Sequence, residues 1–255
     1  MQESYNYNFS PKLPGVLINT LPKSGSIFIR TNLAYGLNLQ IKRICPKGAD
    51  WNISPTYLET FVKEQNVIVQ NHFPATYRNL TYLKKSHVNK FVVHFRDPRQ
   101  AMISHMFYWI KDFPAEEVEM QLQELGVPVF WKYNKFCSLS LEAKIYLCIH
   151  YLLPQKIKWI SDWLEIKESD EWNFDILFTS FNDMKKDYVS FINSILDFYG
   201  IERQLWKDPK LNKSSVQHFR KGKINEWKDL LSPYQQKIAN SMIPEKIFEL
   251  LELEK

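Results

Sequence analysis

Short apolar runs that are each followed by helical sequence recur along this chain, and this alternation constrains the fold more than any other feature. Each run is rich in Val, Ile or Phe, as buried strands are. A strand followed by a helix, repeated in this way, predicts an α/β fold in which helices flank a central, mostly parallel sheet. The predicted strands are Val16–Thr20, Val67–Asn71, Phe91–Arg96 and Phe174–Thr179.

The third run shows the transition from strand to helix most clearly, in the segment KFVVHFRDPRQAMISHMFYWI. Asp97 is a suitable N-cap, and Pro98 suits the first helical position because no N–H is needed there. Gln100 occupies the position that completes a capping box. We therefore predict a helix that begins at Pro98.

The rest of the chain is predicted to be mainly helical, and no repeat or linker divides it. We expect residues 1–255 to form a single domain, which at 30.5 kDa has room for a full hydrophobic core. Segment 111–139 breaks the helical pattern, and we interpret it as an insertion that covers the site and forms part of an acceptor pocket. Helices are expected at Leu141–Glu168, at Lys185–Tyr199 before Gly200, after Asn225 and from Pro233 onward.

Charge and composition narrow the class of partner. The net charge of +5 and the isoelectric point near 8.9 favour an anionic ligand, but they fall short of a nucleic-acid-binding protein. The three cysteines show no paired spacing and no residues show the spacing of metal ligands, so neither a disulfide framework nor a metal is expected. The opening MQESYNYNFSPK is not a signal peptide, and charges interrupt the apolar stretch 143–160, so we expect a cytoplasmic protein without a membrane partner.

Polar stretches follow the first three predicted strands, at the edge where parallel sheets bind ligands. The first stretch is Lys23-Ser24-Gly25-Ser26. Gly25 permits close approach of the backbone, amide groups at a helix start point at an anion, and Lys23 adds a positive charge. This is the layout of an oxyanion-binding loop, although a simple strand-to-helix turn with a surface lysine has the same sequence.

Other polar residues are predicted to lie near this loop. His72, in QNHFP after the second strand, is a candidate general base, although a lone histidine is more often structural or exposed. Arg96 follows the third strand and Ser104 lies in the next helix, but an ion pair at a helix start and a small surface residue explain them equally well. The stretch HFRKGKINEWK suits a phosphate or a solvated basic loop, and it contains Arg220, Lys221 and Gly222.

Together these stretches resemble the cytosolic-type sulfotransferase family, which uses 3'-phosphoadenosine 5'-phosphosulfate (PAPS). LPKSGSIF resembles the 5'-phosphosulfate loop P-K-S-G-T-T-W, and RDPRQAMIS resembles the 3'-phosphate motif with its spaced Arg and Ser. FRKGKINEWK resembles the signature R-K-G-x-x-G-D-W-K. QNHFP resembles K-T-H-L-P, which carries the family's catalytic histidine, and FNDMKKD resembles Y-E-D-M-K. The segments occur in the family's order between residues 22 and 228.

The resemblance implies a single α/β domain with a P-loop-like phosphosulfate-binding loop, and transfer of the PAPS sulfo group to a hydroxyl or amine of a small molecule without a metal. Adenosine 3',5'-bisphosphate (PAP) is released. The implied catalytic residues are His72 as general base, Lys23 at the leaving phosphate, and Ser104. The implied cofactor-binding residues are Lys23, Ser24, Gly25, Ser26, Ile27, Phe28, Arg96, Ser104, Phe181, Arg220, Lys221 and Gly222.

The sequence departs from the family's pattern at several positions. Phe28 stands where the family has Trp and Phe181 where it has Tyr, so stacking on adenine is expected to persist with a smaller ring and one hydroxyl fewer. Gln70 replaces a Lys, which removes a positive charge beside the acceptor. Asn225 and Glu226 replace Gly and Asp in the last signature, where the backbone geometry is expected to differ.

The acceptor is less defined. Aromatic residues predict an aromatic-lined pocket, and Phe73, Tyr108, Phe130 and Trp131 are the substrate-binding candidates. Acidic residues around Glu116 either favour a cationic acceptor or form a solvated helix face. Two other functions stay open: a P-loop-type nucleotide or small-molecule kinase, although the full phosphate loop and a strand-end Asp for magnesium are not evident, and a non-catalytic nucleotide-binding protein.

Overall fold

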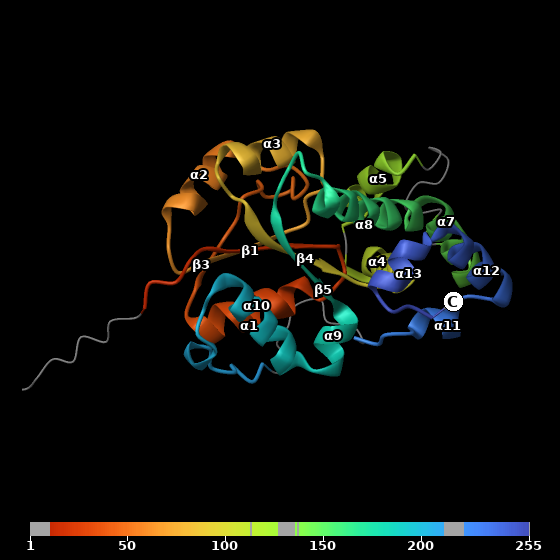
Figure 1. The fold of residues 1–255 in the computed structure, drawn as a ribbon. Coiled ribbons are helices and arrows are strands. Elements are labelled where there is room, and N and C mark those ends of the chain that lie inside the picture. Colours follow the sequence, from red (N-terminus) through yellow and green to blue (C-terminus); the bar gives the residue numbers. More distant parts are fainter. Residues whose placement is uncertain (1–10, 113, 127–135, 137, 212–221, 255) are drawn as a thin grey trace, which may run out of the picture.

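A five-stranded parallel sheet forms the centre of the protein (Figure 1). The computed structural model describes residues 11–112, 114–126, 136, 138–211 and 222–254. All paired strands in it are parallel, which confirms the predicted sheet. The strands are β1 (Val16–Thr20), β2 (Gln40–Lys42), β3 (Val67–Asn71), β4 (Lys90–Phe95) and β5 (Asp175–Ser180), in the order β2-β3-β1-β4-β5.

The order of the strands brings the predicted site segments together. β1 lies between β3 and β4, and the register pairs Asn19 with Asn71 and Thr20 with His94. The carboxyl ends of these three strands therefore meet at one edge of the sheet. Ligands of open parallel sheets bind at such a place, where the chain leaves neighbouring strands in opposite directions.

Helices cover both faces of the sheet because alternate strand residues point to opposite sides. Val16 and Ile18 of β1 enter one hydrophobic cluster, and Leu17 enters the other. Figure 1 shows α1, α9 and α10 on the first face and α2, α3 and α8 on the second. The helices named so far are α1 (Ser26–Leu37), α2 (Pro55–Lys63), α3 (Tyr77–Lys85), α8 (Leu153–Glu168), α9 (Phe181–Lys186) and α10 (Tyr188–Tyr199).

The remaining helices gather beyond the β4–β5 side of the sheet (Figure 1). The described segment 141–168 forms two helices rather than one long helix, because the first helix ends at Tyr151 and the second begins after Leu152. The tail from Pro233 likewise forms two helices. The remaining helices are α4 (Pro98–Asp112), α5 (Ala115–Glu124), α7 (Leu141–Tyr151), α11 (Glu226–Leu230), α12 (Pro233–Met242) and α13 (Glu245–Leu250), with a short 3-10 turn at Arg203–Leu205.

The predicted start of α4 is confirmed, but its predicted capping box is wrong. The backbone N–H of Arg99 donates to Asp97 Oδ1 at 2.9 Å, so Asp97 does cap the helix. The Gln100 side chain instead reaches α11, where its Oε1 accepts from the backbone N–H of Trp227 at 3.2 Å. A tertiary contact with the C-terminal part of the chain therefore takes the place of the local one.

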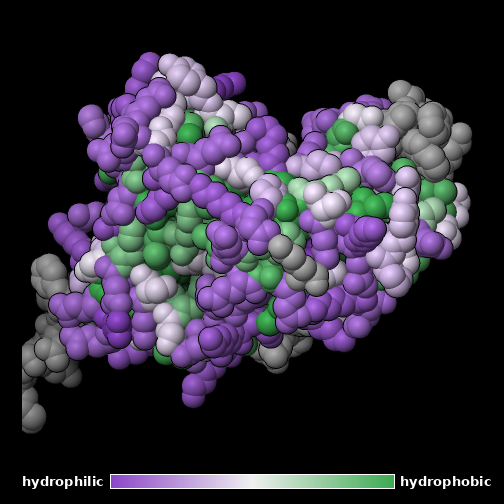
Figure 2. Space-filling view, turned by 45° about the vertical axis from the view of Figure 1, so that its right-hand side comes forward, coloured by the Kyte–Doolittle hydropathy of each residue, from purple (hydrophilic) through white to green (hydrophobic). Residues whose placement is uncertain are grey.

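The predicted insertion at 111–139 contributes to the core where it is described. Val118 and Leu122 of α5 are buried in the main hydrophobic cluster, and so is Phe136. Figure 2 shows a mostly hydrophilic surface on one face, with hydrophobic side chains visible in several separate areas. None of the described helices is both long enough and apolar enough to cross a membrane.

Candidate active site

The segment Lys23-Ser24-Gly25 forms the turn between β1 and α1. Lys23 and Gly25 both have a positive φ, 74° and 89° respectively, a conformation that non-glycine residues adopt rarely and mostly at functional sites. α1 begins at Ser26, and its N-cap Gly25 has no side chain to satisfy the first amide groups. In the described part of the chain, Ser24 Oγ is buried without a hydrogen-bond partner. Uncapped amides and a buried hydroxyl at the positive end of a helix fit a bound oxyanion.

A side chain at position 25 would be crowded and strained. A Cβ there would lie 3.0 Å from Met184 Cε and 3.2 Å from the ring of Phe181, and the positive φ adds backbone strain. Phe181 and Met184 belong to α9, in the stretch FNDMKKD. The sequence segment that follows β5 is thus packed directly against the turn between β1 and α1.

Two side chains from β4 and its end hold the turn in place from the sheet side. His94 donates from Nε2 to the carbonyl oxygen of Ser24 at 3.0 Å, and its Nδ1 accepts from Thr179 Oγ1 at 2.9 Å. Burial lowers the pKa of His94 to about 4, so the ring is neutral near pH 7. Arg96 donates to the carbonyl oxygens of Lys23 at 2.8 Å and Lys223 at 2.7 Å. Arg96 thereby joins the turn to the basic segment near the C-terminus.

Arg99 forms a buried ion pair beside this turn. Arg99 Nη2 lies 2.8 Å from Asp97 Oδ2, and both side chains are buried. The same guanidinium donates to Asn240 Oδ1 at 2.6 Å and stacks over the ring of Trp227 at 3.7 Å. These contacts fasten α4 to α11 and α12, while the guanidinium of Arg96 lies over the Phe181 ring at 4.0 Å, beside the turn.

His72 lies at the end of β3, next to the last residue of β1. Its Nδ1 is 2.8 Å from the carbonyl oxygen of Thr20, which can only accept, so Nδ1 carries the proton and Nε2 presents a lone pair. The Gln70 amide nitrogen lies 3.4 Å from Nε2, and it also donates to Thr20 Oγ1 at 3.1 Å. Gln70, at the position where the family has Lys, is thus in contact with the candidate base.

The surroundings of His72 keep it neutral. Burial lowers its pKa to about 4, the hydrogen bond to Thr20 opposes this shift, and the positive charges of Lys156 and Lys23 add to it. A histidine that is neutral at physiological pH and has a fixed tautomer is suited to accept a proton at Nε2.

Lys23 also contacts helix α4. Its Nζ lies 3.7 Å from the centre of the Tyr108 ring, a cation–π contact that directs the lysine across the turn. Ser104 lies one helical turn before Tyr108 and is half-buried on the same face of α4. The structure therefore brings Lys23, Tyr108 and Ser104 together at one side of the turn.

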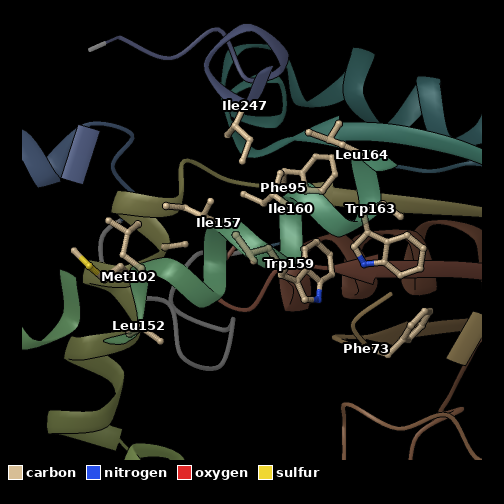
Figure 3. Close-up of a cluster of buried hydrophobic side chains, with 14 of the residues drawn as sticks. Phe73, Phe95, Met102, Leu152, Ile157, Trp159, Ile160, Trp163, Leu164 and Ile247 are labelled. Atoms are coloured by element: carbon tan, nitrogen blue, oxygen red, sulfur yellow. The ribbon is translucent and has the colours of Figure 1, made fainter. Parts of the chain in front are cut away.

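The other predicted site residues lie in different surroundings. Phe73 is fully buried and packs edge-on against Trp163 at 5.8 Å, so it belongs to the core and does not line an accessible pocket (Figure 3). Phe28 is half-buried and meets Tyr188 edge-on at 6.0 Å. Ile27 lies in the first turn of α1, and Gly222 has a φ of 60°. Four predicted residues lie outside the described residues: Phe130, Trp131, Arg220 and Lys221.

Sequence reasoning missed several residues of this region. His94 and Thr20 belong to predicted strands, where a polar residue in an apolar run is the only available signal. Lys156 and His105 lie in helices whose pattern does not mark them, and Nζ of Lys156 is 2.9 Å from Nδ1 of His105. Lys156 and His105 become neighbours only because α8 packs against α4 in the fold.

Comparisons with known sequences and structures identify the family of this chain. No curated protein sequence matches the chain. A mouse sulfotransferase, SULT7A1, solved in complex with PAP, is 18% identical with a TM-score of 0.55, over 93% of this chain and 83% of its own. A sulfotransferase from Alicyclobacillus acidocaldarius is 11% identical with a TM-score of 0.55, over 95% of this chain and 97% of its own. The family model described as "Sulfotransferase domain" matches residues 13–250, and the chain therefore belongs to the sulfotransferase domain family.

Proposed function

We propose that this protein transfers the sulfo group of PAPS to a hydroxyl or amine of a small-molecule acceptor and releases PAP. The observation that carries the proposal is the convergence of an uncapped helix start, a lysine and a neutral histidine at the carboxyl edge of β1 and β3. The complex of the mouse sulfotransferase with PAP supports PAPS as the donor. In the cell, we place the reaction in the cytoplasm.

The residues of the turn fit a bound phosphosulfate. The amides at the start of α1 and the buried hydroxyl of Ser24 are donors for the 5'-phosphate. Arg96, Ser104 and Gly222 are the described candidates for the 3'-phosphate, and Phe28 and Phe181 for the adenine. PAPS, when bound, supplies an activated sulfo group with a good leaving phosphate.

Each catalytic residue has a separate task in this proposal. His72 Nε2 accepts the proton of the acceptor as the bond between the acceptor and sulfur forms, while its Nδ1–H remains on the Thr20 carbonyl. Lys23 leaves the Tyr108 ring and stabilises the negative charge that develops as the bond between sulfur and the bridging oxygen breaks. Most of the rate acceleration then comes from positioning and charge stabilisation, as in phosphoryl transfer.

A thermal-shift titration tests the donor site first. PAP is compared with AMP and with ADP plus Mg²⁺, since a ligand present at about 100 times its Kd adds roughly 2.7 kcal/mol of stability. Stabilisation by PAP well above that by AMP supports the proposal. Stabilisation by ADP with Mg²⁺ alone contradicts it and favours a kinase. PAP binding without turnover on any acceptor favours a non-catalytic nucleotide-binding protein.

A further inference from the structure

Helix α8 carries a lysine in the interior beside the proposed site. Lys156 is only 5% exposed, and its Nζ lies 2.9 Å from Nδ1 of His105 on α4. Burial, with help from Lys156 and Lys23, holds the pKa of His105 well below its usual value, so the neutral ring accepts and Lys156 donates. The other side of the His105 ring bonds with Gln121 of α5. The Lys156 ammonium has three N–H groups, so its bond to His105 leaves N–H groups that can donate to another acceptor.

The surroundings of Lys156 do not neutralise its charge. Within the described ranges, no carboxylate forms an ion pair with it, and the charge that acts on it is the positive charge of Lys23. Lys156 and Lys23 in turn both act on His72, which places the buried lysine among the proposed catalytic residues. Because no opposite charge compensates it, burial lowers the pKa of Lys156 to about 7, so near neutral pH the group exchanges between amine and ammonium, and a bound anion would favour the ammonium.

Further hydrogen-bond donors lie on the same face of α8. Trp159 and Trp163 follow Lys156 at intervals of three and four residues, which places all three on one side of the helix. Across the described chain, the indole N–H groups of both tryptophans are buried without an acceptor. Figure 3 shows the two indoles on the side of α8 that faces Phe73, the residue directly after His72. This face therefore offers two unused indole donors, and its lysine becomes positively charged when it is protonated.

We propose that Lys156 is the anion-recognising residue of the acceptor subsite, and that the acceptor carries an anionic group, such as a carboxylate, in addition to the group that receives the sulfo group. This inference rests on the proposed sulfotransferase function. Gln70 has lost the positive charge that the family carries on β3, and Lys156 supplies one from α8 when it is protonated. The acidic side chains of Asp112, Glu116 and Glu117 are exposed, so they do not define the charge inside the site.

The test compares matched probes on the protein saturated with PAP. Benzoate is paired with benzyl alcohol, and para-hydroxyphenylpropionate with para-propylphenol, while tyramine is the cationic probe; affinities are measured by calorimetry. We expect the anionic member of at least one pair to bind roughly tenfold tighter or more, as one charge-assisted hydrogen bond allows. Lys156→Met should abolish that difference and leave the PAP affinity unchanged. Lys158→Met is the matched control, because Lys158 lies on the exposed face of the same helix.

Every outcome is informative. Equal affinity within both pairs, tighter binding of tyramine, or no detectable binding of either anion at millimolar concentration overturns the inference. The same follows if Lys156→Met retains the preference for anions. If Lys156→Met fails to fold, the comparison within the wild-type pairs still decides. A protein that does not bind PAP at all contradicts the proposed function instead, so the two failures are distinguishable.

Discussion

The Nδ1 atom of His72 lies 2.8 Å from the main-chain oxygen of Thr20, and this contact joins the ends of β3 and β1. The carbonyl belongs to Thr20, the last residue of β1, immediately before the segment that leads into the candidate anion-binding turn. The candidate base and the candidate phosphosulfate turn are therefore positioned by the same strand. A rigid sheet edge holds both, which suits a reaction that depends on alignment of donor and acceptor.

Removal of the imidazole should abolish most of the activity without loss of the donor site. We expect His72→Ala to lower kcat by roughly 10²–10⁴-fold, the usual contribution of a general base. PAP affinity, measured by calorimetry, should stay within a few-fold of wild type, because the turn and Arg96 are intact. His150→Ala, on the exposed side of α7, is the control and should be fully active. Near-normal turnover of His72→Ala would remove this residue from the proposed role.

The pH dependence of kcat/KM for PAPS should show the unusual acidity of His72. Burial lowers its pKa to about 4, and the catalytic form is the neutral one. Activity should therefore rise with pH through about 4 and show no His-like ionisation near 6.5. The profile is measured with acceptor held saturating, so that it reports the groups of the PAPS-free protein. Because Lys156 has a pKa of about 7, an inflection near 6.5 would contradict the proposed environment of His72 only if it persists in Lys156→Met.

A methyl group at position 25 should damage the donor site by two separable effects. Gly25→Ala strains a positive φ and presses on Met184 and Phe181, so we expect a loss of about 1–3 kcal/mol in stability and a marked loss of PAP affinity. Gly48→Ala is the matched control, because Gly48 has a φ of +81° but open space around it. The difference between the two variants, from chemical denaturation, isolates the crowding at the turn. Equal losses in both variants would show that the contacts of Gly25 do not matter.

Two arginines near the start of α4 should separate binding from stability. Arg96 bonds to the carbonyl oxygens of Lys23 and Lys223, so Arg96→Ala should mainly weaken PAP binding, by tenfold or more. Arg99→Ala leaves the buried Asp97 without its partner and should cost roughly 3–5 kcal/mol of stability. Calorimetry and denaturation on both variants check this division. An unchanged PAP Kd in Arg96→Ala would remove Arg96 from the donor site.

The sequence was a good guide to the fold because its apolar runs are buried on both faces. Val16–Thr20 and Val67–Asn71 were predicted with their observed bounds, since central parallel strands are buried on both faces and these two begin with uninterrupted apolar runs. β2 was missed because Gln40–Lys42 is a short, largely exposed edge strand without that signal. The capping role predicted for Gln100 is wrong because its side chain bonds to the backbone of the distant Trp227 instead of to the start of its own helix.

The candidate site was predictable only where a residue follows a strand. Lys23, His72 and Arg96 each lie at the end of a predicted strand or within three residues of it, so topology alone gathers them. Phe73 follows His72 but points into the core, a side-chain direction that the sequence does not reveal. Lys156 and His105 meet only because α8 packs on α4, so no local pattern marks their pairing.

The buried lysine should make the protein less stable than it could be, and in a pH-dependent way. Burial lowers the pKa of Lys156 from 10.5 to about 7, so between these values the unfolded chain binds more protons than the folded one. The free energy of unfolding should therefore rise with pH from about 7 toward 10.5.

Lys156→Met removes the charge and should be more stable than wild type at pH 7 by about 1–3 kcal/mol, the scale found when buried charges are replaced by apolar groups. The gain should shrink at pH 9, where wild-type Lys156 is already neutral in the folded state. Urea denaturation of both proteins at the two pH values measures this, with Lys158→Met as the control that leaves the buried charge in place. Destabilisation of Lys156→Met at pH 7 would show that the hydrogen bond to His105 outweighs the cost of burying the ammonium.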